Sequence, residues 1–243
     1  MRASDGMVEI KGLRKVYRLG QEKVVALDSV DLSIGRREVC CLLGPSGSGK
    51  STLLNMMAGL ERPTKGTVAI NGRLVTSMSE KQLAAFRQSN IGFIFQAYNL
   101  LPNITAMENV ALPLMIKHVP SRLRNARAAA MLRMVGLGSH LRHKPMQMSG
   151  GQQQRVGIAR ALVTKPPILF ADEPTGNLDS KTSAEVMDIL LGISRLNGIT
   201  LILVTHDSDI ARYADKVVYI QDGNVGKIEV RAEMPQTARH GGV

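Results

Sequence analysis

Short apolar runs alternate with amphipathic segments along most of the chain. Alternating apolar and polar residues predict a half-buried strand over 8–13, and further strands are predicted at 24–27, 30–34 and 38–43. Apolar runs typical of buried strands lie at 91–95, 168–171, 200–204 and 216–220. Helices are predicted at 51–58, at 79–88 with Ser79 as N-cap, and at 181–196. Strands that alternate with helices indicate an α/β fold whose parallel sheet is covered on both faces.

Two short segments predict tight turns, and one long segment lacks strands. Asn71-Gly72 separates apolar runs at 67–70 and 73–75, which predicts a hairpin with a two-residue turn, and Asp222-Gly223 predicts another turn. Between about 97 and 150 the helical patterns lie at 106–110, at 121–135 and in a helix opened by Ser149, so we interpret this stretch as a helical insertion. The first six residues and the polar tail from Arg231 onward are expected to be loosely ordered.

Composition adds limits to this picture. At 243 residues the chain suits one α/β domain with an inserted subdomain. Phe and Tyr number four each and Trp is absent, so the core must be aliphatic and rich in methionine. No apolar run reaches the roughly 18 residues of a membrane span, and no secretion signal is recognised. We therefore expect a cytoplasmic protein, or one held at a membrane by a partner.

The two cysteines, Cys40 and Cys41, are adjacent on one predicted strand. Successive strand residues point to opposite faces, which disfavours a disulfide between them. Buried, reduced thiols and a reducing compartment are therefore expected.

The charge balance is strongly basic, with 31 Lys and Arg against 20 Asp and Glu and a net charge of +11. Such a balance attracts nucleic acid, anionic lipid or nucleotide. The basic residues are scattered, and the densest stretch, 117–144, falls on predicted helix that lacks aromatic residues for base stacking. We interpret it as a solvated helix face and expect no specific nucleic-acid partner.

The clearest candidate site is a glycine-rich loop between the strand at 38–43 and the helix at 51–58. It matches the phosphate-binding pattern GxxxxGK[ST] and comprises Gly44, Pro45, Ser46, Gly47, Ser48, Gly49, Lys50, Ser51 and Thr52. Its glycines let backbone N–H groups approach phosphate oxygens, and the helix adds its positive N-terminal end. Lys50 is expected to reach the β- and γ-phosphates and Ser51 to bind Mg²⁺. Upstream, Tyr17 is a candidate for stacking on an adenine ring.

Polar side chains at the ends of other predicted strands complete the candidate site. Asp172 and Glu173 end the run at 168–171, and ligands bind at that edge of open α/β sheets. Asp172 is expected to hold Mg²⁺ and Glu173 to polarise the water that attacks the γ-phosphate. Gln96 is a candidate sensor of Mg²⁺ and of that water, and His206 is a candidate hydrogen-bond donor to the γ-phosphate.

Residues 148–155, with the sequence MSGGQQQR, resemble the LSGGQ signature of ATP-binding-cassette (ABC) ATPases, and Met148 replaces Leu as a volume-conserving change. The other motifs of that family stand in its order: Tyr17 as the A-loop, 44–52 as Walker A, Gln96 as the Q-loop, Asp172 and Glu173 as Walker B and catalytic glutamate, Asn177-Leu178-Asp179 as the D-loop, and His206 as the H-loop. The resemblance covers about residues 8–228.

The resemblance implies a fold and a division of the chain. The implied fold is a P-loop NTPase of the ABC type, with a mixed, mainly parallel core sheet, an antiparallel β subdomain and an inserted α-helical subdomain. Residues 8–95 and 160–228 would form the nucleotide-binding core with the β subdomain. Residues 97–159 would form the helical subdomain that carries the signature, and residues 231–243 a flexible tail.

Three stretches, 91–102, 108–114 and 171–179, resemble the MacB/LolD subgroup of that family, of which FtsE is a near relative. This resemblance implies an ATPase that drives an FtsX- or MacB-like permease, in efflux or in lipoprotein or peptide export, from the cytoplasmic face of a membrane. It leaves open the transported substrate, the direction of transport and the involvement of an extracytoplasmic adaptor.

The signature also implies a homodimer. Ser149 is a predicted N-cap, and Gly150 and Gly151 leave backbone N–H groups open, so this helix end is a second anion site. In the family this site meets the γ-phosphate held by the other chain of a two-fold dimer, and Gln152 and Asp179 are counted with the nucleotide-binding residues. ATP would close the pair, and hydrolysis would open it and pass the motion on through the 96–102 surface.

Two other interpretations remain open. The charge suggests a soluble ABC ATPase that acts on nucleic acid or ribosomes, although the chain holds one cassette and no coiled-coil insertion; stimulation by DNA or RNA, with none by a permease, would favour it. A P-loop kinase of small molecules would leave the signature without a function, and a phosphorylated product in place of free phosphate would support it.

Overall fold

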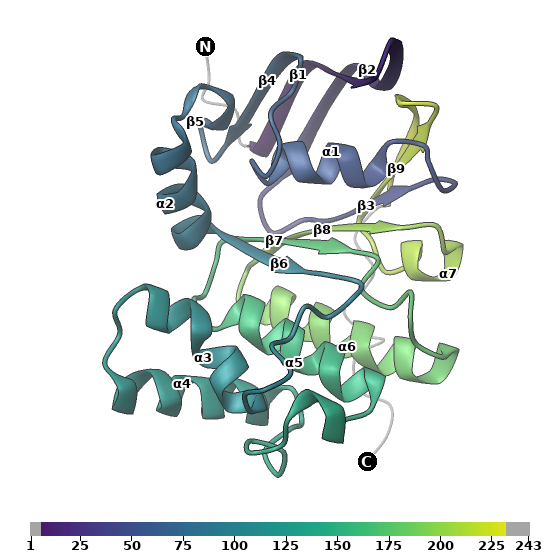
Figure 1. Ribbon diagram of the computed structural model, residues 1–243. Helices are drawn as coiled ribbons and strands as arrows, with labels where there is room; N and C mark the ends of the chain where they lie inside the picture. The colour runs from purple at the N-terminus through teal and green to yellow at the C-terminus, as the bar shows by residue number, and fades with distance from the viewer. Residues whose placement is uncertain (1–5, 232–243) are drawn as a thin grey trace.

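The computed structural model describes residues 6–231, which form two sheets and a layer of helices (Figure 1). The antiparallel sheet has the order β2-β1-β4-β5, from strands Glu22–Gly35, Gly6–Leu19, Lys65–Ile70 and Arg73–Leu74. The second sheet has the order β10-β9-β3-β8-β7-β6, from strands Asn224–Val230, Lys216–Gln221, Val39–Leu43, Thr200–Thr205, Ile168–Asp172 and Ile91–Ile94. Its neighbouring strands are parallel except β10 and β9. The predicted α/β fold is confirmed.

The helices cover both faces of the second sheet. α1 (Lys50–Met57) lies between the two sheets, and α2 (Glu80–Asn90) stands beside it (Figure 1). On the other face lie α3 (Ala106–Ile116), α4 (Ser121–Met134), α5 (Gly150–Leu162) and α6 (Ser180–Leu196), with the short α7 (Ser208–Ala211) at one end. Two 3₁₀ turns, η1 and η2, span Val75–Ser77 and Pro145–Gln147.

Two apolar clusters form the core, one on each face of the second sheet. The first joins α1 to both sheets, and the second joins the sheet to α3–α6. Cys40 belongs to the first cluster and Cys41 to the second, and both are fully buried and free. The predicted opposite orientation of the two thiols is therefore confirmed.

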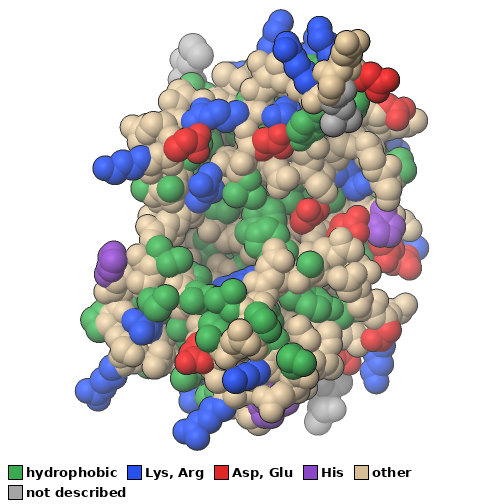
Figure 2. Space-filling view, in the orientation of Figure 1, with side chains coloured by type: hydrophobic (Ala, Val, Ile, Leu, Met, Phe, Trp, Pro, Cys, Tyr) green, Lys and Arg blue, Asp and Glu red, His purple; other side chains and the backbone are tan. Residues whose placement is uncertain are grey.

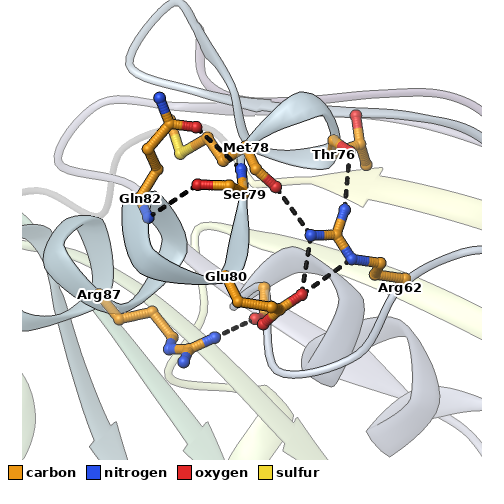
Figure 3. A network of polar contacts seen from close by, with 8 residues as sticks. Arg62, Thr76, Met78, Ser79, Glu80, Gln82 and Arg87 are labelled. Atoms are coloured by element: carbon orange, nitrogen blue, oxygen red, sulfur yellow. Dashed lines mark hydrogen bonds and ion pairs between the residues drawn. The ribbon is translucent and has the colours of Figure 1, made fainter.

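A polar network fixes α2 to the chain that follows α1 (Figure 3). The Gln82 N–H donates to Ser79 Oγ, and the Ser79 N–H donates to Gln82 Oε1, which makes the N-cap predicted at Ser79 a complete capping box. Arg62 donates to Glu80 Oε1 at 2.8 Å and to the Met78 carbonyl oxygen at 2.7 Å. The Arg87 guanidinium donates to the Gly59 carbonyl oxygen at the other end of the helix. These contacts fix the position of α2, which packs beside β6.

The hairpins follow the predicted turns, while one strand boundary does not. Asn71 and Gly72 both have positive φ, and the Ile70–Arg73 pair closes the β4–β5 hairpin as predicted. The strands predicted at 24–27 and 30–34 are one strand, β2, because Ser29 adopts a φ of 57° and absorbs the irregularity within it. The polar residues Asp28 and Ser29 interrupt the apolar pattern, which is why the sequence predicts two strands where the structure has one.

Other boundaries differ by a few residues. Val75 lies in η1 instead of the predicted strand, because its side chain is buried in the core beneath the hairpin. β6 ends at Ile94, and α3 continues past Val110, through Pro113, to Ile116. β10, which the pattern did not predict, pairs with β9 after the turn at Asp222. Loose order was expected for residues 1–6 and from Arg231 onward, but Gly6 begins β1 and the Arg231 N–H donates to the Asp215 carbonyl oxygen at 2.8 Å, so the expectation is wrong for these two residues. For residues 1–5 and 232–243 it lies outside the described residues.

Candidate active site

The phosphate-binding pattern lies at the carboxyl edge of the six-stranded sheet, between β3 and α1. Gly47 and Gly49 have φ values of 79° and 98°. A Cβ at Gly49 would lie 2.5 Å from the Ala26 carbonyl oxygen, and one at Gly44 would lie 2.1 Å from that of Ile220. Glycine is therefore required at both positions, whereas Gly47 faces open space. The loop has the tight backbone that a phosphate cradle needs.

Lys50 is the first residue of α1 and points back along the loop. Its side chain is buried, and Nζ donates to the Pro45 carbonyl oxygen at 2.7 Å. Burial lowers the pKa of Lys50, while the nearby carboxylates of Glu173 and Asp172 act in the opposite direction. The ammonium group is thus held over the loop by a contact that phosphate oxygens can replace.

Asp172, at the end of β7, meets the loop through Ser51. The Ser51 hydroxyl donates to Asp172 Oδ1 at 3.0 Å. Burial raises the pKa of Asp172, and the hydrogen bond from Ser51 opposes that rise. These paired oxygen donors are of the kind that Mg²⁺ prefers. In residues 6–231 no group of three or more His, Cys, Asp or Glu could hold a metal, so a magnesium site here would need phosphate oxygens and water as further ligands.

The loop holds one polar atom without a protein partner. Ser48 Oγ is buried and makes no hydrogen bond within the part of the chain that the structure describes. A buried hydroxyl left unpaired costs free energy. Together with the glycine geometry and the Ser51–Asp172 pair, this fits a bound magnesium–nucleotide complex.

Glu173 and His206 come together from the ends of adjacent strands β7 and β8. Glu173 Oε1 lies 3.0 Å from His206 Nδ1. The Glu173 backbone has a φ of 44°, and its N–H donates to the Val204 carbonyl oxygen at 3.0 Å. The Asp207 N–H donates to Thr205 Oγ1, which fixes the turn that presents His206. The predicted base and the predicted histidine therefore contact each other directly.

Gln96 follows β6 and approaches the same carboxylate. Asn177 Nδ2 donates to the Gln96 carbonyl oxygen at 3.0 Å. The Gly176 backbone lies against both Gln96 and Glu173, since a Cβ there would be 2.9 Å from Gln96 Nε2 and 3.2 Å from Glu173 Oε2. The structure thus brings Gln96, Asp172, Glu173 and His206 to one edge of the sheet.

Tyr17, on β1, lies close to the phosphate loop but is engaged by other side chains. Its hydroxyl donates to Glu61 Oε2 at 2.8 Å, and Lys15 Nζ lies 4.9 Å from its ring centroid. Burial and Glu61 raise the pKa of Tyr17, while a hydrogen bond with Thr52 lowers it. Stacking of this ring on an adenine stays a prediction.

The signature residues do not meet the phosphate loop of their own chain. Ser149 is the N-cap of α5, which packs in the core cluster on the face of the sheet opposite α1 (Figure 1). Gly150 and Gly151 begin that helix, and the Gln152 side chain closes a capping box with Ser149. Asp179 is likewise engaged locally, because the N–H and hydroxyl of Thr182 donate to it and lower its pKa.

Sequence reasoning missed the side chain that joins the Gln96 segment to α5. Tyr98 and Asn99 have φ values of 58° and 49°, and Arg160 donates to both of their carbonyl oxygens. The Tyr98 hydroxyl lies against Gly150, where a Cβ would be 2.9 Å from it. No sequence pattern predicts two consecutive non-glycine residues in the left-handed region, or a hydrogen bond between Arg160 and Tyr98, which are 62 residues apart.

A family model described as "ABC transporter" matches residues 27–176, more than half of the chain. The lipoprotein-releasing system ATP-binding protein LolD 2 of Caulobacter vibrioides is 46% identical over 222 residues, 91% of this chain and 97% of that one. The macrolide export ATP-binding/permease protein MacB of Syntrophobacter fumaroxidans is 44% identical over 236 residues, 96% of this chain and 33% of that longer protein.

Among solved structures, one similar chain is an ATP-binding cassette of Methanocaldococcus jannaschii, seen as a dimer in a post-hydrolysis state bound to ADP and Pi. It matches with a TM-score of 0.87 and 43% identity, over 94% of this chain and 100% of that chain. Within residues 6–231, none of the helices combines the length and hydrophobicity of a membrane span.

Proposed function

The chain belongs to the ABC transporter family as an ATP-binding, ATP-hydrolysing subunit, and we propose that two copies enclose ATP between the phosphate loop of one and the α5 tip of the other. The observation that carries this proposal is that the N-terminal ends of α1 and α5, the two candidate phosphate-binding ends, belong to helices on opposite faces of one sheet. One chain cannot bring both ends to one phosphate, whereas a two-fold pair of chains can. Membership of this family makes the kinase interpretation wrong.

Residues of the phosphate loop would bind the nucleotide. Lys50 would exchange the Pro45 carbonyl for β- and γ-phosphate oxygens, and the backbone N–H groups at Gly47 and Gly49 would donate to them. Ser51 and Asp172 would hold Mg²⁺, which would neutralise phosphate charge. Tyr17 would stack on the base once Lys15 has moved from its ring.

Glu173 would act as the base that orients the attacking water. Its unusual φ turns the carboxylate off the end of β7 toward His206, whose Nδ1–H would hold Oε1 and leave Oε2 facing Gln96. Gln96 would complete the polar shell around the water and the metal. In the partner subunit, Ser149 with the N–H groups of Gly150 and Gly151 would contact the γ-phosphate, and Gln152 and Asp179 would lie beside it.

The division of the chain predicted from sequence is kept as part of the proposal. All strands of both sheets lie outside residues 97–159, and α3 and α4 lie inside, which supports a helical subdomain there. Helix α5 runs through the proposed boundary at residues 159–160. Motion of this subdomain would therefore be transmitted along a continuous helix into the core.

A membrane partner would bind in an apolar groove of ≈ 590 Å³ between α2, β6, α3 and α5. Ala85, Phe93, Leu112 and Ile116 line it, and Figure 2 shows hydrophobic side chains gathered around a hollow on this face. A short amphipathic helix of a permease suits such a groove. Arg160 lines the groove and also donates to the carbonyl oxygens of Tyr98 and Asn99. Binding of a partner in the groove would therefore be coupled to the position of the segment that follows Gln96.

By this proposal the partner is an FtsX- or MacB-like permease, and the subunit is a peripheral protein on the cytoplasmic face of the membrane. The MacB relative, named as an ATP-binding/permease protein, supports a permease of that class. An extracytoplasmic adaptor is compatible with this arrangement and is not required by any contact described here.

The test uses Glu173→Gln, which keeps the size of the side chain and removes the base. We expect this variant to bind ATP normally, to lose at least about 100-fold in turnover, and to become a dimer when ATP is added. Sedimentation velocity with ATP, with ADP and without nucleotide measures the change. Normal turnover would show that the base is misassigned. A strictly monomeric ATP complex, also with the permease present, would refute the proposed enclosure of ATP between two chains, which we call the ATP clamp.

A further inference from the structure

The end of α5 that carries Ser149 contacts a side chain outside all of the motifs above, His140. This residue lies in the loop between α4 and η2 and is half-buried. Its Nε2 lies 3.2 Å from Gln152 Nε2, and its Nδ1 lies 2.9 Å from Ser139 Oγ. The Gln152 amide thus has two neighbours, the imidazole on one side and the Ser149 backbone on the other.

Backbone chemistry decides which atom of this amide faces which neighbour. The Ser149 N–H can only donate, and it lies 2.9 Å from Gln152 Oε1. The amide nitrogen must then face His140, and it too can only donate. A hydrogen bond from this amide requires His140 Nε2 to be the acceptor, and the ring proton would then be on Nδ1, which lies 2.9 Å from Ser139 Oγ.

The loop is anchored so that this acceptor stays in place. The Ala106 N–H donates to the His143 carbonyl oxygen at 2.8 Å, and the Met107 N–H donates to that of Leu141 at 3.0 Å. The His143 ring lies against the His140 ring, with centroids 4.9 Å apart. Two backbone bonds to the first turn of α3 and one ring contact thus restrain His140.

We propose that His140 is a positioning residue for the ATP clamp: its Nε2 accepts a hydrogen bond from the Gln152 amide nitrogen and holds that side chain where Oε1 closes the capping box on Ser149. This inference rests on the proposed function, because the Ser149 end of α5 acts on the nucleotide of the partner. Without an acceptor at position 140, the Gln152 NH₂ group loses its partner and the side chain is held only by the Ser149 N–H. The capping box is then less restrained and opens more often.

Two substitutions separate the acceptor from the bulk of the side chain. His140→Leu removes the acceptor, and His140→Gln offers an amide oxygen at a similar reach. Each is combined with Glu173→Gln, and the ATP-dependent monomer–dimer equilibrium is measured by sedimentation. We expect His140→Leu to weaken the dimer at least about fivefold, His140→Gln to stay within about twofold of the parent, and ATP binding to the monomer to be unchanged in both.

A spectroscopic measurement tests the same inference without a partner. In ¹⁵N-labelled protein the ring signals of His140 are identified by their loss in His140→Gln, and long-range ¹H–¹⁵N correlations report the tautomer. We expect the proton on Nδ1. A proton on Nε2, or equal dimer affinity for Leu and Gln variants, would overturn the inference. Failure of Glu173→Gln itself to dimerise would instead refute the proposed clamp, and the tautomer would still decide the role of His140.

Discussion

His206 Nδ1 lies 3.0 Å from Glu173 Oε1, although the two residues follow different strands, β8 and β7, and are 33 positions apart. The parallel register of β7 and β8, in which Asp172 is paired with Val204, makes this contact possible. Glu173 is half-buried, and one of its two carboxylate oxygens is taken by the histidine. In the proposed mechanism the other oxygen would orient the attacking water, and the histidine would fix the direction in which Glu173 acts as a base.

The first prediction concerns this contact. His206→Ala should leave ATP binding unchanged and lower turnover by at least about tenfold, because Glu173 loses the group that orients it. Steady-state phosphate release and ATP titration separate the two effects. His118→Ala, on an exposed histidine after α3, is the matched control and should behave as the parent. Turnover equal to that of the parent would remove His206 from the site.

The second prediction concerns stability and pH. Burial raises the pKa of folded Asp172 above its unfolded value of about 4. The folded state therefore binds this proton more strongly, and the stability that the group contributes is lost as pH rises through the folded pKa. At pH 7, in the absence of nucleotide, the ionised carboxylate thus lowers the free energy of unfolding. Asp172→Asn should therefore raise the melting temperature by up to about 4 °C.

Calorimetry of nucleotide-free protein checks this, and the gain should shrink as the pH falls toward 4. The same variant should lose the magnesium dependence of ATP binding. Asp188→Asn, on the exposed face of α6, is the control and should change neither property. A lower melting temperature for Asp172→Asn at pH 7 would contradict the assigned effect of burial.

The third prediction concerns the cysteines. Burial raises the pKa of Cys41 to about 12 and that of Cys40 further. At pH 8 the thiolate fraction of Cys41 is therefore about 1,000-fold below that of an exposed thiol. Folded protein should react with a disulfide reagent only as fast as it unfolds, and both thiols should react at once in denaturant. Fast labelling of either thiol in native buffer would contradict the burial.

The fourth prediction concerns the apolar groove between α2, β6, α3 and α5, where we propose that a permease binds. Ala85 lies on α2 at the groove, and Ala85→Arg would fill it with a long charged side chain while keeping helix propensity. Association with membranes that contain the permease should be lost, and ATP binding should be retained. The control, Ser89→Arg, introduces an arginine on the same helix at a position outside the groove lining. Equal membrane association of both variants would refute docking at this groove.

The sequence predicts those parts of the site that depend on local pattern. Gly44–Thr52, and the positions of Asp172 and His206 at the ends of apolar runs, follow from strand, loop and helix order. The left-handed Ser29 that keeps β2 continuous does not, because no residue type at that position demands it. Arg160 and its carbonyl partners depend on packing between α5 and the segment after β6, which no periodicity encodes.

The central claim, that each ATP site is built from two chains, is tested most directly by mixing two defective variants. Both carry Glu173→Gln; one adds Lys50→Ala, and the other adds Ser149→Asp, which keeps an N-cap but sets a negative charge against phosphate. Native mass spectrometry with ATP should show each variant alone as a monomer and the mixture as a mixed dimer with one ATP. Dimers of either variant alone, or a mixture that stays monomeric, would contradict the account.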